Sequence, residues 1–236
     1  EKPSLQVIKI YYFCTKKMIR LFSTKQLSPT QRQAFTSAGF SLEMEDFIEI
    51  LPVAPIGAIP QADYFLFSSQ NTLLSLAQNP YYAQLPHKRA FCVGEKTRQL
   101  LEQMGWEVLA SFDYAKDLAP FLVEHYSEAS FVFFCGAQRM NTLPNTLRAH
   151  HISLQEYIVY HTALTPKRLE SPYDALLFFS PSAIESYLKD NEIGREKLIC
   201  IGETTYAALP KGSQGYIAPR PTIEGVLECC ISLFDN

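Results

Sequence analysis

Glycine and hydroxyl residues follow two apolar runs in a pattern suited to binding an anion. One run ends in Ser68 and Ser69, and the next ends in Gly94, with Thr97 three residues later. Where a strand leads into a helix, the first helical amides have no partner within the helix and carry the positive end of its dipole. Glycine lets a ligand approach the backbone, and a hydroxyl adds a donor. Turns of this kind can bind carboxylate or phosphate groups.

The same two turns occur again later in the chain. Leu177-Phe178-Phe179-Ser180-Pro181-Ser182 matches the first, and Ile201-Gly202-Glu203-Thr204-Thr205 matches Val93-Gly94-Glu95-Lys96-Thr97. A single such turn is explained more simply by helix capping, because Ser, Thr and Gly are common caps. Four turns in two matching pairs favour a shared anionic ligand. The turns lack the Gly-Lys of a P-loop and the G-x-G-x-x-G of a dinucleotide site.

The surrounding pattern predicts an α/β protein with mainly parallel sheets, because short apolar runs alternate with amphipathic segments. A helix is predicted from Pro29 to Ala38, capped by Ser28 and ended by Gly39. The predicted strands are Ile19 to Ser23, Tyr64 to Phe67, Ala90 to Val93, Val108 to Ser111, Phe131 to Phe134, Ala175 to Phe179, Leu198 to Ile201 and Tyr216 to Ala218.

Two longer extended segments, Phe47 to Val53 and Gln155 to Leu164, interrupt this alternation. They predict a chain that leaves one domain and later returns to it. We expect a discontinuous first domain (18–50 and 166–236), an inserted second domain (56–155), linker strands at 51–55 and 156–165, and an N-terminal extension at 1–17.

Composition limits the possible partners and compartment. A net charge of −3 and a pI of about 6.0 argue against a nucleic-acid partner. The six cysteines show no C-x-x-C spacing, which favours free thiols in a reducing, cytoplasmic setting. No apolar run is long enough to cross a bilayer, and the N-terminal segment does not have the charge order of a signal peptide. We expect a cytoplasmic monomer.

In their order along the chain, these segments resemble the uroporphyrinogen-III synthase family. The resemblance covers roughly residues 19 to 228 and is carried by Phe67-Ser68-Ser69, Val93 to Thr97, Gly136 with Leu143-Pro144, Ile158-Val159-Tyr160-His161-Thr162, Phe178 to Ser182 and Ile201 to Thr205. It implies two flavodoxin-like domains with parallel sheets, joined by a two-stranded linker, with one domain discontinuous.

The resemblance also implies a reaction. The family cyclises hydroxymethylbilane, a linear tetrapyrrole, to uroporphyrinogen III with loss of water and inversion of ring D, in heme biosynthesis. The substrate supplies the nucleophile and the electrons, so no metal or other cofactor is expected. The protein must provide orientation, since unassisted closure gives the isomer without inversion.

Site residues follow from the same resemblance. Tyr160 is the candidate acid for the departing hydroxyl. The substrate's acetate and propionate groups would be held by two sets of residues, Ser68, Ser69, Gly94, Thr97 and Gly136 in one domain and Ser180, Ser182, Gly202, Thr204 and Thr205 in the other. The chain departs from the family where members often carry arginine: it has Met140, with Arg139 one position earlier, and Thr24-Lys25 after the first strand.

Two hypotheses of other classes remain open at this point. A non-catalytic two-domain module could bind a tetrapyrrole or another polycarboxylate in its cleft through the same turns. A phosphorylated signalling domain of similar topology is weakened, because no cluster of adjacent Asp residues ends a predicted strand.

Overall fold

The computed structural model describes residues 18–53, 61–85 and 88–234, and these divide into two compact α/β units. Unit 1 comprises the chain up to Glu49 and from Leu164 onward, and unit 2 runs from Ile50 to Ala163. The predicted fold class is confirmed, including the discontinuous unit and the two-stranded connection. The expected extension at 1–17 lies outside the described residues.

The sheet of unit 1 has the strand order β2-β1-β9-β10-β11, which is the flavodoxin order. Its recorded pairings are all parallel. The strands are β1 (Arg20–Ser23), β2 (Ser41–Met44), β9 (Ala175–Phe178), β10 (Lys197–Cys200) and β11 (Gly215–Ile217), and the helices are α2 (Pro29–Ser37), α7 (Pro181–Asp190), α8 (Glu203–Tyr206) and α9 (Ile223–Phe234). The sequence had not predicted β2.

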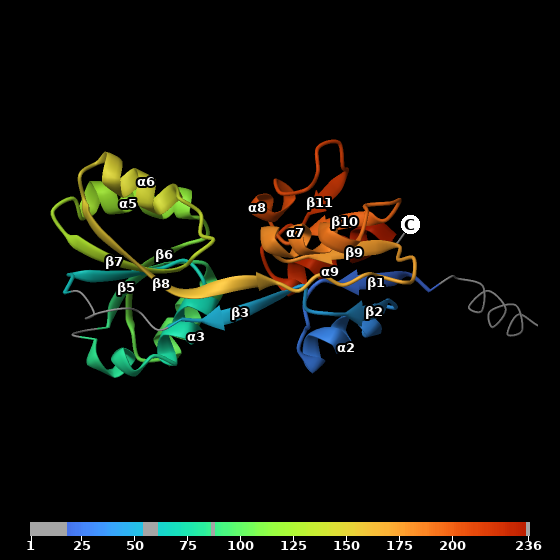
Figure 1. The fold of residues 1–236 in the computed structure, drawn as a ribbon, viewed down its shortest axis with the longest axis horizontal. Helices are drawn as coiled ribbons and strands as arrows, with labels where there is room; N and C mark the ends of the chain where they lie inside the picture. The colour runs from blue at the N-terminus through green and yellow to red at the C-terminus, as the bar shows by residue number, and fades with distance from the viewer. Residues whose placement is uncertain (1–17, 54–60, 86–87, 235–236) are drawn as a thin grey trace, which may run out of the picture. The chain divides into compact units, whose positions relative to one another are not determined.

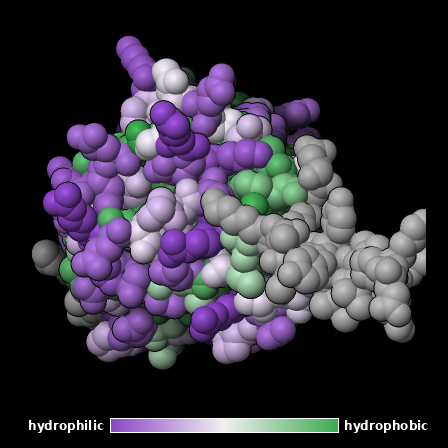
Figure 2. All heavy atoms as spheres, turned by 90° about the vertical axis from the view of Figure 1, so that its right-hand side faces the viewer, coloured by the Kyte–Doolittle hydropathy of each residue, from purple (hydrophilic) through white to green (hydrophobic). Residues whose placement is uncertain are grey.

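Helices cover both faces of this sheet. Phe35 of α2 and Val226 of α9 pack on one face, and Ile184 and Tyr187 of α7 pack on the other. Residues Leu21, Leu177 and Ile199 face the first group, whereas Phe22, Leu176, Phe178 and Leu198 face the second. The mostly hydrophilic face of this unit, with its hydrophobic side chains in small groups, is shown in Figure 2.

The sheet of unit 2 has the order β3-β8-β7-β4-β5-β6. Its strands are β3 (Ile48–Pro52), β4 (Tyr64–Phe67), β5 (Arg89–Val93), β6 (Glu107–Phe112), β7 (Ser130–Gly136) and β8 (Ser153–Leu164). The helices are α3 (Gln70–Ala77), α4 (Glu95–Gln103), α5 (Ala115–His125) and α6 (Thr142–Ala149), with a short 3-10 helix at Pro80–Gln84. In Figure 1, α5 and α6 lie on one face of the sheet and α3 on the other.

The two sheets share one topology in permuted chain order. If β7 and β8 of unit 2 are equated with β1 and β2 of unit 1, then β4, β5 and β6 match β9, β10 and β11. The segments expected to be linker strands are β3 and β8, which are neighbours in the sheet and point in opposite directions in Figure 1. Strand β8 pairs with β7 from Ser153 to Tyr160, so residues 156–160 lie in the sheet of unit 2.

Candidate functional site

In unit 2 the predicted residues gather at the carboxyl ends of the strands. Phe67 at the end of β4 pairs with Phe134 of β7 and with Cys92 of β5. Ser68 and Gly94 therefore follow β4 and β5, and Gly136 ends the adjacent β7, so the three lie at one edge of the sheet. The chain order reverses between β7 and β4, and ligands of open α/β sheets bind at such a switch point.

Two helices begin at this edge. Ser69 caps α3, its side chain accepting a hydrogen bond from the Asn71 amide at 3.2 Å. Gly94 precedes α4 with φ 89°, a backbone conformation that only glycine adopts without strain. Gln70 Nε2 donates to the carbonyl of Lys96 at 3.1 Å and ties the two helix starts together. The sequence-predicted turns thus form one continuous polar edge.

Tyr160 lies beside these turns on the neighbouring strand β8, opposite Gly136. Burial raises the pKa of the Tyr160 phenol, and the hydroxyls of Ser69 and Thr72 lower it by a smaller amount. The phenol is therefore neutral at neutral pH and can donate a hydrogen bond or a proton. This is the state that the role of an acid requires.

Thr72 was missed by the sequence analysis. It lies three residues after Ser69, so the first turn of α3 places it back over the cap, and it is 1% exposed. Its Oγ1 lies close enough to the phenol to affect its pKa but makes no hydrogen bond of normal geometry. The Ser-x-x-Thr spacing after a strand is the signal that could have identified it.

Unit 1 presents a similar edge. Ser180 caps α7 and accepts a hydrogen bond from the Ala183 amide at 3.1 Å, and the half-buried Ser182 follows it. Gly202 precedes α8 after the adjacent strand β10. Thr222, which the sequence analysis also missed, accepts a hydrogen bond from the Gly225 amide at 3.0 Å at the start of α9. A Thr directly before a long apolar helix is the signal that was available.

The three threonines of the Gly-Glu turns differ in exposure. Thr97 and Thr205 both occupy the third helical position and are 4% and 3% exposed. Their side chains face the protein interior, whereas Thr204 is exposed. Of the hydroxyls in these turns, that of Thr204 is therefore the one placed to meet a ligand.

The basic residues noted in the sequence have different surroundings. Arg139 and Arg148 both pair with Glu156, whose side chain is 12% exposed. Arg139 is thus engaged within the protein. Lys25 is exposed after β1, at the switch point between β1 and β9, where its charge is available to an anion.

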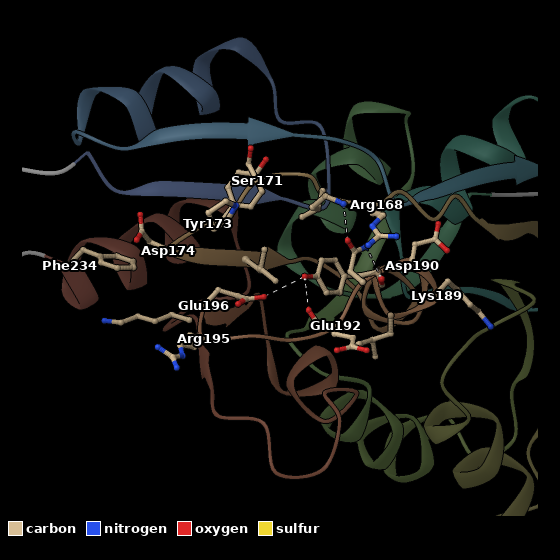
Figure 3. A pocket seen from close by; sticks show the side chains of 17 residues that line it. Arg168, Ser171, Tyr173, Asp174, Lys189, Asp190, Glu192, Arg195, Glu196 and Phe234 are labelled. Carbon is tan, nitrogen blue, oxygen red and sulfur yellow. Dashed lines mark hydrogen bonds between the residues drawn. The ribbon is translucent and has the colours of Figure 1, made fainter.

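A cavity of about 1230 Å³ lies elsewhere in unit 1, at the amino ends of the strands. Figure 3 shows its lining. The Tyr187 hydroxyl donates to the backbone carbonyl of Glu192 and to the Glu196 carboxylate. Four basic and four acidic side chains line it, so they offer no net charge to a polycarboxylate: Arg168, Lys189, Arg195 and Lys197, and Asp174, Asp190, Glu192 and Glu196. None of the predicted site residues lines this cavity.

Two further features concern cofactors and the membrane. Within the described ranges, no group of three or more His, Cys, Asp or Glu side chains is arranged to hold a metal ion. Over those same ranges, no helix combines the length and apolar character needed to cross a membrane. Five of the cysteines are described, and none of the five is in a disulfide.

Comparison with known proteins gives a family and a fold. No curated protein sequence gives a significant match. Uroporphyrinogen-III synthetase from Helicobacter pylori is similar in structure, with a TM-score of 0.68 at 20% identity over 92% of this chain and 100% of that one. A mutant uroporphyrinogen III synthase from Thermus thermophilus gives 0.65 at 16% identity over 92% and 99%.

These identities establish the shared fold alone. The family model described as uroporphyrinogen-III synthase HemD, in contrast, matches this sequence itself over residues 32–228. This match spans most of the chain and includes both units. The chain therefore belongs to the uroporphyrinogen-III synthase family, whose members are lyases of porphyrin and heme biosynthesis.

Proposed function

We propose that this chain converts hydroxymethylbilane to uroporphyrinogen III, with loss of water and inversion of ring D, and that Tyr160 and the paired turns perform this reaction. The observation that supports the residue assignment best is the half-buried Tyr160 phenol beside the Ser69 cap of α3. It combines a proton donor with an anion-binding helix start at one sheet edge. The alternative of a non-catalytic binding module does not account for this phenol.

Binding of the substrate's carboxylates falls to the helix starts. Helices α3, α4 and α7 have eight, nine and ten residues, long enough for their amides and dipoles to attract an anion. Ser68, Ser69 and Gly94 serve in unit 2, and Ser180, Ser182 and Thr204 serve in unit 1. These neutral donors let an acidic protein hold a polyanion without a basic patch.

The chemical step begins with loss of the terminal hydroxyl. The C–O electron pair leaves with oxygen, the Tyr160 phenol supplies a proton, and water departs. The azafulvene left behind is attacked by ring D through its substituted carbon. The spiro intermediate fragments, and ring D recloses through its unsubstituted carbon, which then loses a proton. The proton given at the start equals the proton released at the end, so Tyr160 can be restored without an external acid.

The phenol keeps its proton at neutral pH, and burial raises its pKa further. A free phenol is a weak acid, with a pKa of about 10. Its contribution therefore comes from orientation and from a hydrogen bond that strengthens as charge develops on the leaving oxygen. The binding turns hold the substrate so that ring D, rather than solvent, meets the azafulvene.

The cellular setting is part of the same proposal. The protein acts as a cytoplasmic monomer, with no nucleic-acid partner, metal or other cofactor. The absence of disulfides among the five described cysteines supports a reducing compartment, and the net charge of −3 argues against a nucleic acid. Analytical ultracentrifugation tests whether the protein is a monomer in solution.

The decisive experiment supplies hydroxymethylbilane to the purified protein and separates the uroporphyrinogen isomers formed. We expect mainly the type III isomer, at a rate proportional to enzyme concentration. A product dominated by the type I isomer, as in buffer alone, contradicts the enzyme. Tight binding of the substrate with no type III product would favour the binding module instead.

A further inference from the structure

Gly136 makes an unusually close approach to Tyr160. A Cβ atom built on Gly136 would lie 2.4 Å from Cζ of Tyr160 and 2.7 Å from its hydroxyl oxygen. The φ of Gly136 lies outside the left-handed region, so its backbone would accept any residue. Glycine is therefore needed here for the space taken by the ring of Tyr160 rather than for a special backbone conformation.

Strand β8 has an irregularity at the same place. Cys135 pairs with Ile158 and Gly136 pairs with Tyr160, so one extra residue is inserted on β8. Successive side chains of a strand normally point to opposite faces. Val159 and Tyr160 nevertheless pack in the same hydrophobic cluster as Phe65 and Phe134, on the face covered by α3. The bulge thus turns Tyr160 toward α3, as bulges near active sites often do.

The backbone holds this arrangement from the other side. The amide of Ala137, the residue after Gly136, donates to the carbonyl of Tyr160 at 3.0 Å. The end of β7, where Gly136 leaves space for the ring, is therefore also hydrogen-bonded to the backbone of Tyr160. The ring lies between this backbone and the Ser69 and Thr72 hydroxyls of α3.

We propose that Gly136 is a positioning residue for Tyr160 rather than a residue that binds substrate. Because it has no side chain, it leaves the space in which the phenol is held beside the Ser69 cap. This inference rests on the proposed function of Tyr160. Gly136→Ala would displace the ring while leaving the helix starts that bind carboxylates in place. Binding and catalysis should therefore respond differently.

A double-mutant cycle tests the proposal, with Gly136→Ala, Tyr160→Ala and the double variant assayed for type III product. We expect Gly136→Ala to lower kcat by about 10- to 100-fold, since a displacement of about 1 Å can cost that much, with KM within about threefold. In the Tyr160→Ala background the added methyl should change kcat by less than about twofold. A full additional loss there would show that Gly136 acts independently of Tyr160 and would overturn the proposal.

A second measurement keeps the test sound if Gly136→Ala is poorly active. The phenol pKa of Tyr160 is obtained from ultraviolet pH-difference spectra, by subtracting the matching Tyr160→Ala spectrum. Because burial raises this pKa, a displaced ring should titrate at lower pH in Gly136→Ala than in the wild type. An unchanged pKa would show that the ring has not moved.

Gly194→Ala is the matched control. Its Cβ would lie 2.7 Å from Oε2 of Glu196, the far end of a flexible side chain, in a loop of unit 1 outside the proposed machinery. Its kcat and the titration of Tyr160 should match those of the wild type. If the wild type itself forms no type III isomer, the proposed function fails. If the wild type is active and Gly136→Ala equals it, only the positioning role fails.

Discussion

The two Gly-Glu turns have matching sequences but different structures in the two units. Gly94 of unit 2 has φ 89° and ψ 132° and precedes a helix of nine residues. Gly202 of unit 1 is fully extended, with φ −172° and ψ 176°, and precedes a helix of four residues. A four-residue helix sums few peptide dipoles and attracts an anion weakly. The matching sequences therefore indicate that the two turns occupy the same place in the fold, but not that they bind an anion equally well.

The units also differ beside their switch points. The β7–β8 pairing of unit 2 ends with Gly136 and Tyr160, whereas the β1–β2 pairing of unit 1 ends with Ser23 and Met44. Both units offer capped helix starts, but only in unit 2 does the last pair of these two strands include a phenol. We therefore place the proposed chemistry in unit 2 and the proposed carboxylate binding in both units.

The largest effect is expected from Tyr160→Phe. Removing the acid should lower kcat by about 100-fold with KM little changed, as for loss of a general acid. The wild type should lose activity as the pH rises through the raised pKa of Tyr160, and the variant should lack this alkaline limb. Met44→Leu in unit 1, a swap of similar volume, is the control and should remain near wild type. Equal turnover of Tyr160→Phe and wild type would make the tyrosine a packing residue.

The next largest effect is expected from substitution of the glycines in the two turns, and it concerns the free energy of unfolding. Gly94→Ala should lower the free energy of unfolding by about 1–3 kcal/mol, because a non-glycine residue is strained at this φ. Gly202→Ala should change it by less than about 0.5 kcal/mol, since its Cβ would meet only the Cβ of Pro221 at 3.9 Å. Urea unfolding followed by circular dichroism measures both. Equal losses would remove the difference between the turns.

Trp106 can show that the Gly94 effect belongs to unit 2. It is the only tryptophan of the chain, is 4% exposed, and donates from Nε1 to the Tyr82 hydroxyl at 2.9 Å within that unit. Its fluorescence midpoint should shift with Gly94→Ala. A shift of the same size with Gly202→Ala would mean that the two units unfold as one.

The sequence predicted the central strands and their turns because their signals are local. The apolar run from Tyr64 to Phe67 and the cap at Ser69 are adjacent in the chain, as are Ala175 to Phe178 and Ser180. Strand β2, Ser-Leu-Glu-Met, has one buried residue, Leu42, and was missed because four residues of mixed polarity carry no clear period.

The remaining features depend on contacts between distant segments. The bulge in β8 exists only relative to β7, and the reason for Gly136 is a ring 24 residues away, at Tyr160. The burial of Thr97 and Thr205 likewise follows from how their helices dock on the sheets. The spacing of residues in one sequence does not show these contacts. The sequence therefore identified the residues of the site better than it identified their roles.

The two serine caps should cost similar stability but affect activity differently. Ser69→Ala and Ser180→Ala should each lower the free energy of unfolding by about 1 kcal/mol, the usual value of a lost N-cap. Ser69→Ala should also lower kcat and raise the pKa of Tyr160, because the Ser69 hydroxyl favours the phenolate. Ser180→Ala should mainly raise KM. Steady-state kinetics separates the two, and a fall in kcat limited to Ser180→Ala would reverse the assignment of units.

The smallest effect is expected from Thr72→Val, which keeps the shape of a buried side chain and removes its hydroxyl. Oγ1 makes no hydrogen bond of normal geometry, so its loss should leave the free energy of unfolding unchanged or raise it by up to about 1 kcal/mol. The same hydroxyl lowers the pKa of Tyr160, so its removal should move the alkaline limb of activity to higher pH. Any stability linked to this raised pKa is present below pH of about 10 and is lost as the phenol ionises.

Thr205→Val in unit 1 removes a hydroxyl of similar burial and completes the comparison. It belongs to the other unit, away from the phenol, so the pH at which activity falls should not move, whatever its effect on KM. Activity measured from neutral to alkaline pH for both variants decides the point. A shift with Thr205→Val, or none with Thr72→Val, would mean that the alkaline limb does not report Tyr160.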